Sequence, residues 1–210
     1  MDIYTAINTR RTIRDFDGTL IEMGVVEKII GAGLKAPTND HMRNWEFVIV
    51  NDKNARSELL RIVPEGYSST KPGVDKMLDS WGLTDTMQRD MYLDSVPKQY
   101  AMLLNAGCLI LPFFKTWCDV LKPENMISLA SLASIWLCIE NMLLAAAAEG
   151  IFGVTKIPVG NEPQHIKNVL QHPDDYVLPC YIGLGYPAKD AVVNIQKEVS
   201  AKDKIHIDKW

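Results

Sequence analysis

A run of 23 residues, Met126 to Ala148, is so apolar that protein or lipid must cover most of it. Its length would suffice for a bilayer span, but Glu140 and Asn141 stand side by side within it. A carboxylate in hydrocarbon costs about 2.5–3.5 kcal/mol, and the flanking Lys122 and Glu149 give no positive-inside bias. We therefore expect a helix, apolar nearly all round, at the centre of a compact domain. A bilayer span is the alternative.

The composition of the chain agrees with a compact domain. Of the 210 residues, 47% are hydrophobic and 23% are charged, which is ordinary for a globular protein. The 22 basic and 26 acidic residues give a net charge of −4, which argues against a general affinity for nucleic acid. Any anion-binding site must therefore be a local cluster of basic residues.

The cysteines and the N-terminus bear on the cellular compartment. The four cysteines are far apart in apolar surroundings, and they are Cys108, Cys118, Cys138 and Cys180. Their spacing does not suit a metal site, so we expect reduced core residues and no bound metal. The residues that follow Met1 lack the basic and apolar regions of a secretory signal. Together these features predict a cytoplasmic protein.

The spacing of apolar residues predicts helices and strands mixed along one domain. Helical patterns cover residues 2–9, 22–35, 53–62, 126–148 and 162–170. Apolar runs of strand length cover residues 45–50, 108–114 and 177–184. No repeat or linker divides the chain, so we expect a single α+β or α/β domain over residues 1–210. Small residues at 31–33 allow another element to pack closely there.

Two segments differ from the rest of this domain. Residues 64–98 combine glycine, proline and polar residues with scattered aromatic side chains, which predicts an excursion or lid. Residues 188–210 form a polar C-terminal extension that nevertheless ends in Ile205, Ile207 and Trp210. Apolar side chains at a terminus usually dock on something, and a sheet edge of a second subunit is one such surface.

A cluster of three arginines lies within residues 10–14, directly after the first predicted helix. In an extended segment, Arg10, Thr12 and Arg14 would share one face while Ile13 points to the core. Forked guanidinium donors beside a hydroxyl suit a phosphate dianion. The alternative is a solvated charged face, paired with the aspartates that follow, and on composition alone it is the commoner arrangement.

A polar loop at residues 38–44 separates a predicted helix from a buried strand. Binding sites often lie on such loops, because their side chains face outward from a rigid base. His41 alone is more typical of a surface residue than of a catalyst. The chain has no nucleophile–base pair, carboxylate dyad, P-loop or G-x-G-x-x-G motif. If it is an enzyme, we expect a cofactor to supply the reactive group and no side chain to be an obligatory catalyst.

Four motifs in this order resemble the FMN-dependent nitroreductase family. They are RRTIRDF, APTNDHMRNWEF, IENMLLAAAAEGIFG and IGLGYP, and the resemblance extends from Asp2 to the C-terminal IHID. It implies an α+β fold with a mostly antiparallel central sheet flanked by helices, in an intertwined homodimer that holds FMN at its interface. It also implies ping-pong hydride transfer from NADH or NADPH through flavin N5 to a nitroaromatic, quinone or similar small acceptor, without a membrane or nucleic-acid partner.

The resemblance carries the family's phosphate clamp to the N-terminal motif. The corresponding residues are Arg10, Arg11, Thr12 and Arg14. Threonine replaces the family's serine here and keeps its hydroxyl group. A basic residue after the GYP turn completes the family's site, and Lys197 corresponds to it by spacing, with Lys189 and Lys202 as alternatives.

The resemblance also assigns contacts to the flavin ring. The loop that reaches the ring from the partner subunit corresponds to Pro37, Thr38, Asn39 and His41. In this loop His41, Arg43 and Asn44 depart from the family's asparagine, glutamine and proline. A cation at the pyrimidine edge would stabilise anionic reduced flavin, so we expect these departures to affect the redox potential and the choice of acceptor.

The stretch from Gly153 to Pro158 corresponds to the one whose backbone amide meets flavin N5, with Thr155 and Ile157 as contact residues. Because proline has no N–H, Ile157 is the expected donor. Two other functions stay open. A non-catalytic flavin-binding or flavin-handling protein would keep the clamp but react slowly with nicotinamides, and a reductive dehalogenase or flavin-degrading enzyme is a closer variant.

Overall fold

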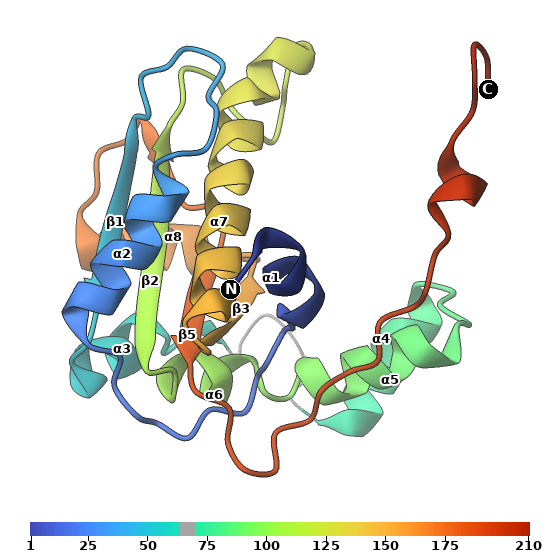
Figure 1. Ribbon diagram of the computed structural model, residues 1–210. Coiled ribbons are helices and arrows are strands. Elements are labelled where there is room, and N and C mark those ends of the chain that lie inside the picture. The colour runs from blue at the N-terminus through green and yellow to red at the C-terminus, as the bar shows by residue number, and fades with distance from the viewer. Residues whose placement is uncertain (64–69) are drawn as a thin grey trace.

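The computed structural model describes residues 1–63 and 70–210 (Figure 1). Its centre is a five-stranded sheet with the order β1-β2-β5-β3, in which β4 pairs with β2. All of the strand pairs are antiparallel. The strands are β1 (Trp45–Val50), β2 (Cys108–Lys115), β3 (Phe152–Lys156), β4 (Tyr176–Val177) and β5 (Tyr181–Gly185). The expected α+β fold with an antiparallel sheet is thereby confirmed.

Helices cover both faces of this sheet. They are α1 (Ile3–Thr9), α2 (Met23–Gly33), α3 (Lys53–Leu59), α4 (Lys71–Ser80), α5 (Thr86–Ser95), α6 (Gln99–Leu104), α7 (Ala130–Ala148) and α8 (Glu162–Leu170). Aspartate caps begin several of them: the Asp2, Asp52 and Asp85 carboxylates accept backbone N–H groups of the first turns of α1, α3 and α5. Short 3₁₀ helices lie at η2 (Met126–Leu129) and η3 (Ala201–Lys204).

The central strand β2 explains the two layers of helices. Its first seven residues are all buried, as expected for a continuous apolar run. Cys108, Ile110 and Phe114 pack into a cluster with residues of α2 and α7. The side chains between them, including Leu109 and Leu111, pack with α3, α6 and α8 on the other face. One apolar strand therefore anchors both hydrophobic cores.

The expected core helix is formed by η2 and α7 together. By length and composition it is the one candidate membrane span in the described part of the chain. Its inner face packs on α2, β2 and β3, with Ile135, Cys138 and Met142 fully buried. Its outer face is not covered, since Leu137 is 49% exposed and the carboxylate of Glu140 reaches the surface. The expectation of a core helix is right for one face, and the other face presents apolar side chains at the surface.

The structure corrects several expectations for individual elements. β3 was not among the predicted strands, because Gly153, Thr155 and Lys156 break up its apolar character, and pairing with β5 forms it. The predicted strand 177–184 is divided between β4 and β5, since Pro179 between them has no N–H for a sheet ladder. Cys118 is only partly buried, and its thiol donates to the carbonyl of Ser128.

The predicted excursion or lid at residues 64–98 is mostly helical in the part that the structure describes. Residues 64–69 of the predicted segment 64–98 lie outside the described residues, and α4 and α5 occupy most of the remainder. Val74, Leu78 and Val96 form a small separate core there. The C-terminal segment runs past α5 and then away from the sheet (Figure 1). Its apolar side chains are exposed, and Trp210 is fully so.

The close approach of α2 and α7 gives a first prediction. A Cβ added at Gly33 would lie 2.6 Å from Cγ of Met142 and 2.9 Å from Sγ of Cys138. Gly33→Ala should therefore lower the free energy of unfolding by about 1–3 kcal/mol, measured by urea denaturation. Gly31→Ala is the matched control, because nothing lies within 4 Å of its added Cβ. That change should stabilise the chain by about 0.5–1 kcal/mol. Equal effects of the two changes would contradict the packing described here.

Candidate functional site

The arginine segment lies along the outer edge of β3. Thr12 forms a parallel bridge with Gly153, and the Ile13 N–H donates to the carbonyl of Gly153 at 3.4 Å. Ile13 is buried, as the alternation predicts, while Arg10 and Arg14 remain partly exposed. The segment thus adds a short extended stretch to the sheet and turns its basic side chains away from the core.

Among the described residues, the three arginines have only loose ionic contacts or a bond to a backbone carbonyl. Arg10 Nε lies 3.6 Å from a carboxylate oxygen of Glu140 on α7. A nitrogen of Arg11 donates to the carbonyl of Arg10 at 2.7 Å. Arg14 lies 4.0 Å from the carboxylate of Asp94 and 3.7 Å from the sulfur of Met91, both on α5. None of these is a paired, two-pronged contact, so guanidinium donors remain for another anion.

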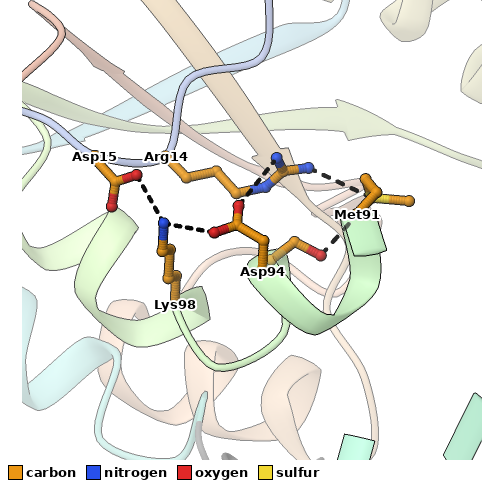
Figure 2. A network of polar contacts seen from close by, with 6 residues as sticks. Arg14, Asp15, Met91, Asp94 and Lys98 are labelled. Carbon is orange, nitrogen blue, oxygen red and sulfur yellow. Dashed lines mark hydrogen bonds and ion pairs between the residues drawn. The ribbon is translucent and has the colours of Figure 1, made fainter. Parts of the chain in front are cut away.

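Lys98 neutralises the carboxylates around Arg14 (Figure 2). Its ammonium group lies 2.7 Å from Asp15 and 2.6 Å from Asp94. Although burial opposes it, the hydrogen bonds that the ammonium group donates to these two carboxylates raise the pKa of Lys98. Burial lowers the pKa of Arg14, against the effect of Asp94 and Asp15. The predicted alternative pairs the arginines with Asp15 and Asp17. Among the described residues, Asp15 forms its ion pair with Lys98, while its charge still acts on Arg14.

The loop at residues 37–44 is held by Arg43. Its guanidinium donates to the carbonyls of Leu34, His41 and Ala36, at 2.9, 3.1 and 3.5 Å. The charge lies over the carbonyl end of α2, where a cation is favourable. His41 and Arg43 both have left-handed backbone conformations, with φ of 59° and 48°. The guanidinium of Arg43 is thus engaged in shaping the loop, whereas the expectation from the sequence was a cation free to lie beside a flavin.

The side chains of this loop differ in their exposure. Pro37, Asn39 and His41 are exposed, as befits residues that reach outward. The hydroxyl of Thr38 is buried and has no hydrogen-bond partner among the described residues. It faces a cavity of about 20 Å³ that Ser131 and other polar residues also line. An unpartnered buried hydroxyl suits a loop whose polar contacts are completed by a ligand or a second chain.

The far end of β3 offers a second set of groups. Thr155 is partly buried, and the side chain of Ile157 is 61% exposed. The Ile157 N–H forms no hydrogen bond with any described residue. Ile157 and Pro158 also line a cavity of about 740 Å³ together with Trp117 and Trp136. At about 3.3 Å per residue, Gly153 and Ile157 are about 13 Å apart along the strand. One edge therefore carries cations at one end and, at the other, an N–H with no hydrogen-bond partner in the described part of the chain.

A single chain does not bring all of the predicted residues together. The arginines lie on the same edge as Thr155 and Ile157. The loop of residues 37–44 lies instead near Ser131 and Ser134 of α7, whereas Arg10 faces Glu140 on another side of this helix. Lys197 also lies apart, 3.7 Å from Asp85 at the start of α5.

Sequence reasoning missed three charged residues of this region. Lys98 and Asp94 stand four positions apart on one helical face, a pattern that would have indicated their ion pair but not their proximity to Arg14. Lys156 is a single basic residue in an otherwise uncharged run. Its buried contact with the start of α8 appears only when β3 is folded.

Comparison with known proteins identifies relatives of the whole chain. The model of the nitroreductase family matches residues 7–186. An iodotyrosine deiodinase of Nematostella vectensis is 24% identical over 196 residues, covering 91% of this chain and 69% of that protein. Iodotyrosine deiodinase of Haliscomenobacter hydrossis is 24% identical over 204 residues, covering 97% and 86%. The chain spans 64% of the length of the mouse enzyme iodotyrosine deiodinase 1, to which it is 25% identical over 197 residues, covering 91% of this chain.

Solved structures share the fold. Oxidised iodotyrosine deiodinase bound to FMN and 3-iodo-L-tyrosine superposes with a TM-score of 0.73 at 18% identity, covering 100% of both chains. Nitroreductase A from Vibrio parahaemolyticus gives a TM-score of 0.68 at 19% identity, covering 100% of this chain and 78% of that one.

The contacts of Arg43 generate a second prediction. Arg43→Ala removes the donors to the carbonyls of Leu34, Ala36 and His41, so the free energy of unfolding should fall by about 1–3 kcal/mol in urea denaturation. Amide hydrogen exchange of residues 37–44 should quicken relative to that of β1. Arg61→Ala serves as the control, since Arg61 makes only an exposed pair with Glu58. Unchanged protection of the loop would refute the role assigned to Arg43.

Proposed function

This chain belongs to the nitroreductase family, and on that premise we propose that it is an FMN-dependent oxidoreductase. One observation carries the proposal: the arginine segment lies on the edge of β3 that ends in the free N–H of Ile157. A phosphate at the basic end and a flavin ring at the other would use groups that have no strong partner among residues 1–63 and 70–210.

The charges at the basic end suit a phosphate. Arg10, Arg11, Thr12 and Arg14 are the residues that would hold it. Together with Lys98, the arginines face the carboxylates of Glu140, Asp94 and Asp15, which leaves an excess of positive charge. A dianion with several acceptor oxygens is attracted by this excess and can take up the remaining guanidinium donors. Lys197 lies beside Asp85 in the free chain and would have to leave it to join the site.

The other contacts of the site would come from a second copy of the chain. The unpartnered hydroxyl of Thr38 and the exposed side chains of Asn39 and His41 lie away from the arginines of their own chain. Apolar side chains of α1 and α7 are exposed beside one another, among them Tyr4 and Leu137. A homodimer would cover this face, complete each site with the partner's loop, and give the C-terminal segment a surface to dock on.

FMN held by these residues would supply hydride chemistry at its N5 atom, between NADH or NADPH and a nitroaromatic, quinone or related acceptor in a ping-pong sequence. The residues of the chain would anchor the phosphate, orient the ring through the Ile157 N–H, and leave the cavity beside Ile157 and Pro158 for the reacting partner. No described side chain is assigned a proton-transfer step. The protein would act by geometry and charge.

Reductive dehalogenation is the second candidate. It is favoured by the names of the relatives, several of which are iodotyrosine deiodinases, and by the structural neighbour that holds 3-iodo-L-tyrosine. The same phosphate clamp and the same edge of β3 would serve this reaction. The difference would lie in the compound that occupies the space beside Ile157.

A variant of the clamp tests cofactor binding. The wild-type protein should be purified yellow with FMN, whereas Arg10→Ala combined with Arg14→Ala should be colourless, because the phosphate loses two of its cations. Absorbance and extraction of the cofactor measure this. Arg61→Ala, a change at an exposed pair just after the end of α3, is expected to keep FMN. Retention of one FMN per chain by the double variant would disprove the clamp.

Mixing two defective proteins extends this test to the dimer. The double variant Asn39→Ala with His41→Ala should also lose FMN, because these two side chains would contact the FMN that the partner chain's clamp holds. Unfolding and refolding an equal mixture with the clamp variant should restore about a quarter of the sites, because each mixed dimer has one site with both sets intact. No recovery, with mixed dimers demonstrably present, would place the two sets in unrelated sites.

The electron donor and the acceptor can be separated by anaerobic rapid mixing. We expect NADH or NADPH to bleach the flavin absorbance within a catalytic turnover, and a nitroaromatic or quinone to restore it. If the chain is a dehalogenase, dithionite-reduced protein should release iodide from 3-iodotyrosine, with tyrosine as the organic product. A non-catalytic flavoprotein would be bleached by dithionite alone and would yield neither product.

A further inference from the structure

A buried ion pair joins the end of β3 to the start of α8. Lys156 is the last residue of the strand and Glu162 is the first residue of the helix. The side chains are 3% and 2% exposed. The ammonium group lies 2.7 and 2.6 Å from the two carboxylate oxygens, and it also donates to the carbonyl of Ile157 at 3.2 Å. These contacts use all three N–H donors of the lysine.

The pleat of β3 puts this pair on the inner side of the strand. Lys156 pairs across the sheet with Tyr181, and its ammonium group lies 5.4 Å from the centre of that ring. Burial lowers the pKa of Lys156, and the Glu162 carboxylate opposes this effect. Burial also raises the pKa of Tyr181, and the charge of Glu162 adds to this. The side chain of Ile157, one residue later, is exposed on the other side.

Stability alone is a weak reason for such a pair. Removing two charges from water costs several kcal/mol for each, and apolar residues of similar volume often stabilise a core equally well. What an apolar pair cannot do is hold a carbonyl group. Lys156 ties the Ile157 carbonyl to the first turn of α8, and the β3–β5 ladder fixes Lys156 itself. Pro158 further restricts the backbone of the residue before it. The conformation of Ile157 is therefore determined from both sides.

We propose that Lys156 and Glu162 are positioning residues, which hold the Ile157 N–H outward for the N5 atom of a bound flavin. The inference rests on the proposed function and adds to it a device that the chain's own charges provide. Neither side chain touches the ligand. Their effect passes through the carbonyl of Ile157 and the connection at residues 157–161.

The redox potential of the bound flavin reports this position. N5 of oxidised flavin is a hydrogen-bond acceptor, whereas N5 of fully reduced flavin carries a hydrogen. A well-placed N–H therefore favours the oxidised form, and loosening it should weaken the binding of oxidised FMN more than that of reduced FMN. The midpoint potential of the bound cofactor should rise as a result.

The main test uses a pair of changes that keeps the net charge. Lys156→Met with Glu162→Gln removes the ammonium without leaving a buried carboxylate, whose own charge would shift the potential. We expect a tenfold greater loss of affinity for oxidised than for reduced FMN, which corresponds to a rise of about 30 mV for a two-electron couple. Fluorescence titration gives the affinities, and equilibration with a reference dye gives the potential.

A matched control separates position from stability. Arg56 is another buried cation, and it donates to the backbone carbonyls of Val50, Leu104 and Ala106 on α3's side of the sheet. Arg56→Met should lower the melting temperature and leave the potential of the flavin unchanged. If the Lys156 and Glu162 variant behaves in the same way, the pair is structural and the inference is wrong.

A milder substitution can be measured if the double variant Lys156→Met with Glu162→Gln does not fold. Glu162→Asp keeps both charges but shortens the carboxylate side chain by one methylene, so it cannot hold the ammonium in the same place. Its potential should shift in the same direction by a smaller amount, and no shift would overturn the inference. Wild-type protein that binds no FMN would overturn the proposed function and this inference with it. Normal FMN binding with unshifted variants overturns the inference alone.

Discussion

Burial of β2 on both of its faces is the constraint on which the rest of the structure depends. Alternate side chains of this strand belong to two separate hydrophobic cores, so helices must cover the sheet on either side. With the faces closed, the outer edge of β3 is a place where backbone and polar side chains can meet a ligand. The arginine segment lies along this edge, and the Ile157 N–H at its end has no hydrogen-bond partner outside the undescribed residues 64–69. The position of the candidate site thus follows from how the core is filled.

The charged side chains at the two ends of the β3 edge differ in burial and in the length of their ionic contacts. At the basic end the contacts of the arginines are long and partly exposed, and Lys98 takes up the nearby carboxylates at short distance. Such pairs are weak and can exchange for a stronger anion. At the other end Lys156 and Glu162 are buried and fully engaged with one another. A buried pair of this kind holds one geometry, because breaking it leaves an unpaired charge in the core.

The proposed homodimer would explain three exposed surfaces of the chain together. Apolar side chains on the outer face of α7, outward side chains of the loop held by Arg43 and the last residues of the C-terminal segment are all exposed at the surface. In a dimer these would serve one purpose, since a second copy would cover the apolar face and receive the loop. The Arg43 guanidinium stiffens the loop for such a role, because it ties the carbonyl of His41 in the loop to the carbonyl of Leu34 at the end of α2.

Elements with a long and regular apolar pattern can be predicted from the sequence. The core helix, the strands β1 and β2 and the inward direction of Ile13 could all be read from spacing, and the order of four motifs indicated the family. Only the tertiary structure decided which charges meet. β3 became a strand by pairing with β5, Lys98 was placed between Asp15 and Asp94, and Lys156 was buried against Glu162. The reason is physical: burial is encoded in local periodicity, whereas an ion pair between distant elements depends on distances that no single segment contains.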